Sequence, residues 1–178
     1  MLGVERRARK PSFLAFCGGL LAAAAIGWQL GVPHAAIARA FEKFAGIGRR
    51  FNQLATLTLA DGGQVALVDD YGHHPKELAA VFAAARGGWP DKRLVVAFQP
   101  HRYSRTRDLF DEFAAVLSSV DALVLTEVYP AREAAIAGAD AKALARSIRT
   151  RGRVDPVVGK AATDLCTALS CVVHDGDW

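Results

Sequence analysis

The sequence lacks the motifs that would directly assign a phosphate-binding loop or a covalent catalyst. No GxxxxGK[ST] segment is present, and no GxGxxG follows an expected strand, so these two glycine-rich phosphate loops are excluded. No Ser–His–Asp or Cys–His arrangement can be argued from position. The three cysteines, Cys17, Cys166 and Cys171, are odd in number and follow no metal or disulfide spacing. This pattern favours three buried thiols in a reducing compartment.

The composition describes a globular chain without repeats or low-complexity segments. Its 178 residues suggest one domain, or one domain with an appendage. A hydrophobic content of 52% is enough for a core and too high for a disordered chain. The net charge of +4 makes acidic ligands plausible but does not by itself imply nucleic acid.

The N-terminal region allows two interpretations. Arg6, Arg7, Arg9 and Lys10 precede an uncharged run over residues 11–32. By pattern alone this resembles a signal peptide or a single membrane span. The run is rich in glycine and alanine, which weakens a span, and a helix buried in a larger protein fits equally well.

The hydrophobic spacing alternates between strands and helices. It predicts helices over residues 20–31, 33–44, 75–86, 108–117, 140–150 and 164–169. It predicts strands over residues 54–59, 64–68, 94–98, 122–125 and 154–158, with a last strand starting at Cys171–Val173. Asp61–Gly62–Gly63 is typical of a hairpin between the first two strands. The later alternation predicts an α/β fold with an open, mostly parallel sheet and helices on both faces.

Polar clusters follow three of the expected strands, where α/β sheets bind their ligands. They span residues 69–74, 99–107 and 127–133. We expect the segments around Tyr71 and Arg102 to converge at one edge of the sheet.

The chemistry of these clusters favours a carboxylate ligand. Arg102 and Arg105 are three residues apart, so on a helix they would share a face and could grip one anion. The alternative is a solvated basic turn that pairs with Asp108 or Asp111. For His73, hydrogen bonding to a substrate or a neighbouring carboxylate is favoured over a metal, since no third His or Cys lies nearby.

Two further positions leave their roles open. Asp70 is a candidate to bind a ribose hydroxyl, a basic group or a Mg²⁺-linked water. The alternative is that it caps the following helix. Arg50 follows a glycine-rich turn. The alternative to a functional role for it is an ordinary surface charge.

Four segments together resemble the Mur ligase family: GIGRRF (46–51), VDDYGHHPKE (68–77), FQPHRYSRTRDLFDEF (98–113), and EVYPARE with GAD (127–140). The resemblance runs from about residue 22 to residue 178. It implies a Rossmann-like C-terminal domain over residues 49–178, preceded by the helical tail of a central ATPase domain over residues 22–48. Residues 1–21 are unmatched. The second half of the apolar run then belongs to a soluble helix, so no membrane partner is expected.

The resemblance also implies an activity. Its motifs are similar to those of members that join UDP-N-acetylmuramate to L-alanine in cytoplasmic peptidoglycan synthesis, through an acyl phosphate made with ATP. ATP and Mg²⁺ would be bound mainly by domains outside this sequence. Arg50 and Asp70 match residues that reach the nucleotide. The cluster around the amino acid and the reacting carboxylate corresponds to Tyr71, His73, His101, Arg102 and Arg105. No catalytic residue and no metal ligand is assigned.

The departures from the family suggest a remnant that is inactive alone. The ATP loop and the UDP-binding domain are absent, and the domain is expected to lack its last strand, which would favour self-association. Two alternatives remain. One is a silent dimerisation domain. The other is a nucleic-acid-binding module that uses Lys92, Arg93, Arg102, Arg105 and Arg107.

Overall fold

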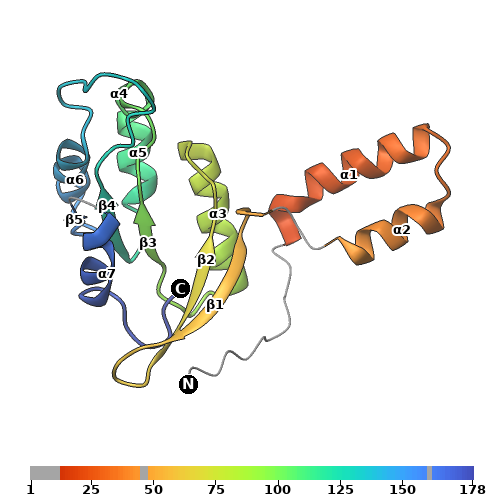
Figure 1. Ribbon diagram of the computed structural model, residues 1–178, viewed down its shortest axis with the longest axis horizontal. Helices are drawn as coiled ribbons and strands as arrows, with labels where there is room; N and C mark the ends of the chain where they lie inside the picture. The colour runs from red at the N-terminus through yellow and green to blue at the C-terminus, as the bar shows by residue number, and fades with distance from the viewer. Residues whose placement is uncertain (1–12, 45–47, 160–161) are drawn as a thin grey trace.

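The computed structural model describes residues 13–44, 48–159 and 162–178 (Figure 1). In chain order the elements are α1 (Phe13–Gln29), α2 (His34–Lys43), β1 (Asn52–Thr58), β2 (Gln64–Asp69), α3 (Pro75–Gly88), β3 (Val95–Phe98), α4 (Tyr103–Asp108), α5 (Phe110–Leu117), β4 (Ala122–Thr126), α6 (Ala141–Arg149), β5 (Val157–Gly159) and α7 (Ala162–Ser170). The predicted order of helices and strands is largely confirmed. The structure adds α4, starts α1 at Phe13 and starts β5 only at Val157.

The strands form two sheets rather than one. β1 and β2 are an antiparallel hairpin, and β3, β4 and β5 form a parallel sheet in that order. The predicted turn is confirmed: Gly62 has a φ of 87°, a conformation that glycine adopts without strain. The α/β prediction holds for the parallel sheet and its crossover helices, but β2 and β3 do not pair with each other.

The core lies between the parallel sheet and its crossover helices. β4 is buried along its whole length, as expected for a strand covered on both faces. Phe113 and Leu117 on α5 and Leu144 and Ile148 on α6 are almost fully buried and belong to the same cluster. The central strand is therefore fixed by apolar packing.

The predicted last strand at Cys171–Val173 is wrong. The amides of Val172 and Val173 both donate to the Leu169 carbonyl, at 3.0 and 2.9 Å. The end of α7 thus winds into a turn, and these bonds override the β propensity of two adjacent valines. Backbone bonds to the neighbouring strands begin only at Gly176, which itself lies in a turn with a φ of 81°.

Residues 176–178 connect the hairpin to the parallel sheet. On the hairpin side, Gly176 donates to the Gln64 carbonyl and Ala66 donates to the Asp177 carbonyl, at 2.9 and 3.2 Å. On the other side, Trp178 donates to the Arg93 carbonyl and accepts from the Val95 amide, at 2.9 and 2.6 Å. This short segment lies between β2 and β3 and bonds to both.

Side chains reinforce this junction. The Asp177 carboxylate is only 4% exposed and lies 2.9 Å from Arg93 Nη1. It also accepts the His174 amide at 2.7 Å. The Trp178 ring lies 3.5 Å from the Trp89 ring, centroid to centroid, and Phe51 is 6.2 Å from Trp178. Removing the partners of this buried carboxylate would destabilise the fold, because its charge would be left unpaired.

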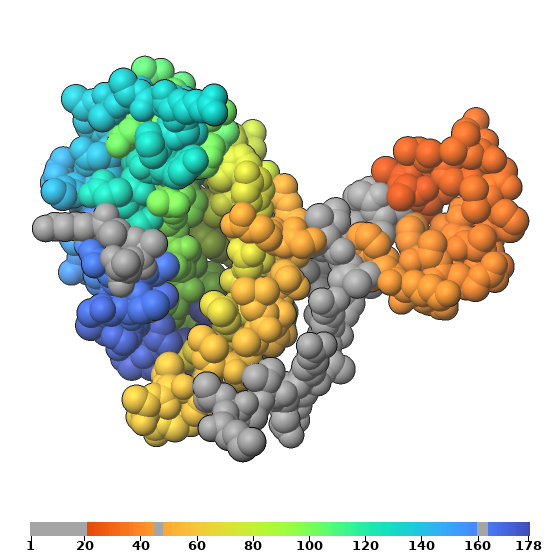
Figure 2. Space-filling model, viewed as in Figure 1, coloured from red at the N-terminus to blue at the C-terminus, as the bar shows by residue number. Residues whose placement is uncertain are grey.

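Helices α1 and α2 extend away from the α/β body as a pair (Figures 1 and 2). Leu21, Ile26 and Trp28 on α1 and Leu30 in the turn after it are each more than 60% exposed. Within the described ranges, no helix has the length and apolar character needed to cross a membrane.

The prediction of three buried thiols is also wrong for two of them. Cys166 and Cys171 are free and exposed. Cys166 lies on α7 beside the half-buried Leu165, and Cys171 lies in the turn that follows. The side chain of Cys17 falls outside the described part.

We predict that Asp177→Ala lowers the free energy of unfolding by about 1–3 kcal/mol, because it leaves an amide and a guanidinium without their acceptor. Asp155→Ala is the matched control, since it removes an exposed partner of Arg149 and should cost less than about 1 kcal/mol. Urea denaturation of the three proteins measures both values. Equal losses in the two variants would contradict a structural junction at Asp177.

Candidate functional site

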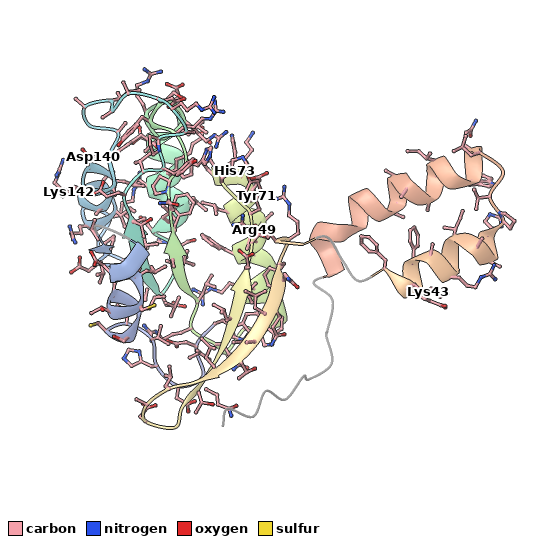
Figure 3. All side chains as sticks on the ribbon, in the orientation of Figure 1. Lys43, Arg49, Tyr71, His73, Asp140 and Lys142 are labelled. Carbon is pink, nitrogen blue, oxygen red and sulfur yellow. The ribbon has the colours of Figure 1, made fainter. Side chains whose placement is uncertain are left out.

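The two motif-bearing loops meet at the carboxyl end of β2 and β3. The His73 ring lies 6.1 Å from the His101 ring. His73 is flanked by Tyr71 at 5.2 Å, and His101 by Tyr129 at 5.2 Å, all between ring centroids. Figure 3 shows Tyr71 and His73 near Arg49 on the side of the hairpin, far from Asp140 and Lys142. The structure therefore brings the segments around Tyr71 and Arg102 to one edge.

Glu77 organises the hairpin side of this edge. Its Oε2 accepts the backbone amides of His73 and His74 at 2.9 and 3.2 Å and so completes a capping box at the start of α3. Its Oε1 lies 3.8 Å from Arg50 Nη1. The hydrogen bond from the His73 amide is the largest influence that lowers the pKa of Glu77. The sequence analysis missed Glu77, although its place three residues after His74, with Pro75 between, is a recognisable helix-start pattern.

Asp70 holds its own loop together. One carboxylate oxygen accepts the Phe51 amide at 2.7 Å, and the other accepts the Gly72 amide at 2.6 Å. A Cβ atom on Gly72 would lie 2.8 Å from Asp70 Oδ1, so only glycine fits there. Asp70 thereby fixes the chain directly after Arg50 and directly after Tyr71.

The backbone at Arg102 is strained. Its φ of 73° and ψ of 133° are unfavourable for a residue with a side chain. The Arg102 amide donates to the Tyr129 carbonyl at 2.8 Å, and the Arg102 carbonyl accepts the buried Thr106 hydroxyl at 2.8 Å. Such strain persists only where the surroundings impose it, and it is concentrated at functional sites.

Glu133 fixes the start of α4. It accepts the amide and the hydroxyl of Ser104 at 2.9 and 2.7 Å. These bonds are the largest causes that lower the pKa of Glu133. Arg102 Nη1 lies 4.0 Å away, a distance too long for a hydrogen bond. The Ser104–Glu133 contact links residues 29 apart in sequence and carries no local signal that sequence analysis could have found.

The pKa of His101 is lowered, which favours its neutral form beside two guanidinium groups. Burial is the main cause that lowers its pKa, and the charges of Arg105, His73 and Arg102 act in the same direction. Arg105 Nη1 lies 3.5 Å from His101 Nδ1 and 3.4 Å from the His101 carbonyl. Arg102 is the residue before α4 and Arg105 lies on it, so the structure supplies the helix that the sequence analysis considered only as a condition, and the two arginines flank His101.

This arrangement can recognise a small anion. Guanidinium groups bind carboxylates through paired hydrogen bonds, and half-exposed tyrosine rings line the approach. Among the residues that the structure describes, no group of three or more His, Cys, Asp or Glu is placed to hold a metal ion. Fold and site together define an α/β domain with an arginine-rich edge at the carboxyl ends of its strands.

Residues 49–178 match the family described as "Mur ligase, glutamate ligase domain". The chain belongs to the Mur ligase family. It is 71% identical to the UDP-N-acetylmuramate–L-alanine ligase of Stenotrophomonas maltophilia (strain K279a), over 88% of this chain and 33% of that protein. It is 72% identical to the ligase of the same name from Xanthomonas campestris pv. campestris (strain B100), with the same coverage. The chain thus spans about a third of the length of these curated relatives.

Solved structures agree with this assignment. The crystal structure of UDP-N-acetylmuramate-alanine ligase from Thermotoga maritima matches 94% of this chain and 33% of its own, with a TM-score of 0.69 and 26% identity. A murein peptide ligase from Psychrobacter arcticus matches with a TM-score of 0.60 and 18% identity, over 96% of this chain and 33% of its own, and supports the fold.

We predict that Arg102→Gly is about 1 kcal/mol more stable than Arg102→Ala, because only glycine relieves the positive φ, and part of that gain is offset by the entropy of glycine. The control is the pair Arg105→Gly and Arg105→Ala. At this position Arg105→Ala should be the more stable variant, by about 0.5–1 kcal/mol, because glycine weakens a helix. Urea denaturation of the four variants measures both differences. The same order at both positions would argue against strain at Arg102.

We also predict that Glu77→Gln destabilises the protein at neutral pH and that its deficit shrinks as the pH falls. The carboxylate pKa is lowered on folding, so its stabilisation is present above the unfolded pKa and lost as the pH drops through the folded one. Denaturation at pH 7 and at about pH 3.5 should show the wild type approaching the variant. Exposed Glu112 supplies the control, Glu112→Gln, whose deficit should stay small at both values. A Glu77→Gln deficit that does not change with pH would refute the role of its charge.

Proposed function

We propose that residues 49–178 are the amino-acid-binding domain of an ATP-dependent ligase that joins L-alanine to UDP-N-acetylmuramate in cytoplasmic peptidoglycan synthesis. The observation that carries the proposal is the meeting of the His73 loop, next to which Arg50 lies, with the His101 loop, which carries Arg102 and Arg105. Identity of 71–72% to ligases of this name supports the substrate class.

The site supplies a binding mode for the amino acid. Arg102 and Arg105 would take the L-alanine carboxylate, since guanidinium groups match its two oxygens. Neutral His101 tolerates the ammonium group nearby, whereas a charged imidazole would repel it. Tyr71 and His73 would bound the site on the hairpin side. These residues orient the amine toward the reacting carboxylate rather than make or break bonds.

The nucleotide contact is proposed for the hairpin side. Arg50 is 42% exposed and makes only a long contact with Glu77, so its guanidinium is available to a phosphate. Asp70 would act chiefly by fixing the loop that carries Arg50, with its remaining lone pairs free for a ribose hydroxyl. Mg²⁺ would supply charge neutralisation on the ATP phosphates, but the described residues do not fit a metal site, so none of its ligands is assigned here.

Helices α1 and α2 are proposed to belong to the end of the preceding ATPase domain. The exposed apolar side chains of this pair and of the turn between them, with Trp28 on α1 at 67% and Leu30 in the turn at 76%, have the character of a surface that packs on another domain. In the proposed ligase, residues 22–48 would connect that domain to this one.

The nucleic-acid alternative finds no support. Arg93 is paired with Asp177, and Arg107 lies 2.7 Å from Asp108, so two of its five cations are already neutralised. Binding of a polyanion draws on a continuous basic patch. The relatives give this alternative no support either.

We predict that L-alanine shifts the amide NMR signals of His73, His101 and Ser104 in the isolated chain, with weak, saturable binding. Arg105→Gln should weaken this binding by at least tenfold, because it removes one of two carboxylate-binding groups. Arg146→Gln, at an exposed arginine on α6, is the control and should bind as the wild type does.

D-Alanine should produce smaller shifts at the same concentrations, since its ammonium group and methyl group exchange places. Shifts confined to residues distant from His73 and His101, or equal affinity in the Arg105→Gln variant, would overturn the proposed site.

A further inference from the structure

The outer side of α6 and the turn that follows it carry a concentrated positive charge. Over residues 141–159 five basic residues stand against one acidic residue, Asp155. The net charge of this segment, +4, equals that of the whole chain, so the basic and acidic residues of the remaining sequence balance. The five basic residues form what we call the α6 basic patch: Lys142, Arg146, Arg149, Arg151 and Arg153.

Helix periodicity places the patch on one side of α6. At 3.6 residues per turn, Lys142, Arg146 and Arg149 fall within about 60° of one another around the helix axis. All three are exposed, and Arg151 and Arg153 in the following turn are exposed too. The patch is therefore a stripe along one side of the helix that continues into the turn.

Most of these cations have no acid beside them. Within the described ranges, the patch makes a single ion pair, between Arg149 and Asp155, and the Asp155 side chain is itself 83% exposed. By contrast, Arg86 and Arg93 lie 2.7 and 2.9 Å from partner carboxylates that are more buried. The charge of the patch is thus left largely uncompensated by the chain.

Helix stability explains only part of the patch. Cations near a helix C-terminus are stabilising, which accounts for Arg146 and Arg149 in the last turn of α6. Lys142 lies in the first turn, where a cation is unfavourable, and Arg153 lies beyond the end of the helix. Like charges four residues apart, as at Lys142 and Arg146, are destabilising as well. Part of the patch therefore works against the stability of α6, which points to a ligand of opposite charge.

Helix α6 is set into the surface of the protein. Five of its nine residues are buried, and Leu144 and Ile148 belong to the main core. Figure 1 shows α6 at the outer edge of the α/β body. Figure 3 shows Lys142 on this edge, far from Tyr71 and His73. The patch is thus a shallow surface that is separate from the arginine-rich edge of the candidate site.

We propose that the α6 basic patch binds the surface of an anionic lipid bilayer. A plane of phosphate headgroups can face all the cations of a shallow patch at once, and guanidinium groups match phosphate oxygens. The contact is peripheral, because the apolar side of α6 is packed in the core and is not available for insertion. The proposal does not depend on the ligase activity proposed above, because it follows from the charge and exposure of α6 alone.

Other anionic partners fit the patch less well. A helix that reads duplex DNA enters the major groove, and α6 cannot do so while more than half of its residues are buried. Single-stranded nucleic acid is held by stacking on aromatic side chains, and residues 141–159 contain none. Protein interfaces are anchored by aromatic or other large side chains in pockets, whereas the exposed residues here are basic residues, Asp155, a threonine and a glycine.

The test measures co-sedimentation of the chain with vesicles of phosphatidylglycerol and phosphatidylcholine in equal parts, and with vesicles of phosphatidylcholine alone. We expect binding to the anionic vesicles only, and we expect it to weaken as salt is added, because salt screens the attraction. The triple variant Lys142→Gln, Arg146→Gln and Arg151→Gln should partition about 100-fold more weakly, at roughly fivefold for each charge removed. Glutamine keeps the helix propensity of the residues it replaces on α6, so the far-UV circular dichroism should not change.

The matched control removes three exposed cations elsewhere: Lys76→Gln, Lys92→Gln and Arg132→Gln. It has the same net charge as the patch variant and should bind nearly as well as the wild type. The basic residues near the N-terminus, over residues 6–10, are unchanged in both variants. A difference between the two variants therefore reports on the patch and not on net charge or on the N-terminal segment.

Equal binding by the two triple variants, or no binding of the wild type to anionic vesicles, would overturn the proposal. Equal binding of the wild type to phosphatidylcholine alone would do so too, because exposed apolar side chains would then be responsible. A labelled DNA duplex and a labelled single-stranded RNA complete the test. Binding of either that is lost in the patch variant, without patch-dependent binding to vesicles, would make nucleic acid the partner and would also overturn the proposal.

Discussion

The site depends on how the β1–β2 hairpin is held against the parallel sheet, because each carries half of it. Arg50, Tyr71 and His73 belong to the hairpin side, and His101, Arg102 and Arg105 follow β3. No strand ladder joins the two sheets along their length. At the base they are joined by the backbone bonds of residues 176–178 and by the Asp177–Arg93 pair. Helix α3 forms a further link, with Leu78, Phe82 and Ala85 in the main core.

The hydrophobic core positions part of the site indirectly, through β3. β4 and the helices packed on it set the position of β3, and β3 in turn aims the loop at His101. On the hairpin side the same task falls to hydrogen bonds. Asp70 and Glu77 each accept two backbone amides, so the His73 loop is fixed by carboxylates rather than by apolar packing. Both halves depend on an ionised carboxylate: Glu77 on the hairpin side and Glu133 at the start of α4, each with a pKa lowered by the hydrogen bonds that it accepts.

Sequence reasoning succeeded where the signal was local. The fully apolar strands, the Asp61–Gly62–Gly63 turn and the polar ends of β2 and β3 were all predicted, and the two loops do meet. It failed where a distant contact decided the outcome. α4 depends on Glu133, 29 residues from Ser104, and on a positive φ at Arg102 that no propensity suggests. Likewise, an apolar run identifies a buried strand but not its neighbours, so the separation of β2 from β3 carried no signal. The roles of the site residues remain proposals.

The acidic residues of the site explain why its arginines remain available. Glu77 and Glu133 lie beside Arg50 and Arg102, and tight ion pairs there would compete with any anionic ligand. Both carboxylates are instead engaged by backbone amides and by the Ser104 hydroxyl at 2.7–3.2 Å. Their distances to the guanidinium groups are 3.8 and 4.0 Å, beyond hydrogen-bonding range. The two glutamates thus reduce the repulsion among the arginines without occupying the hydrogen-bond donors of the guanidinium groups. A ligand carboxylate at hydrogen-bonding distance would interact more strongly than either glutamate does. An edge built in this way is poised to exchange water for a small anion, and that is the property an amino-acid-binding domain requires.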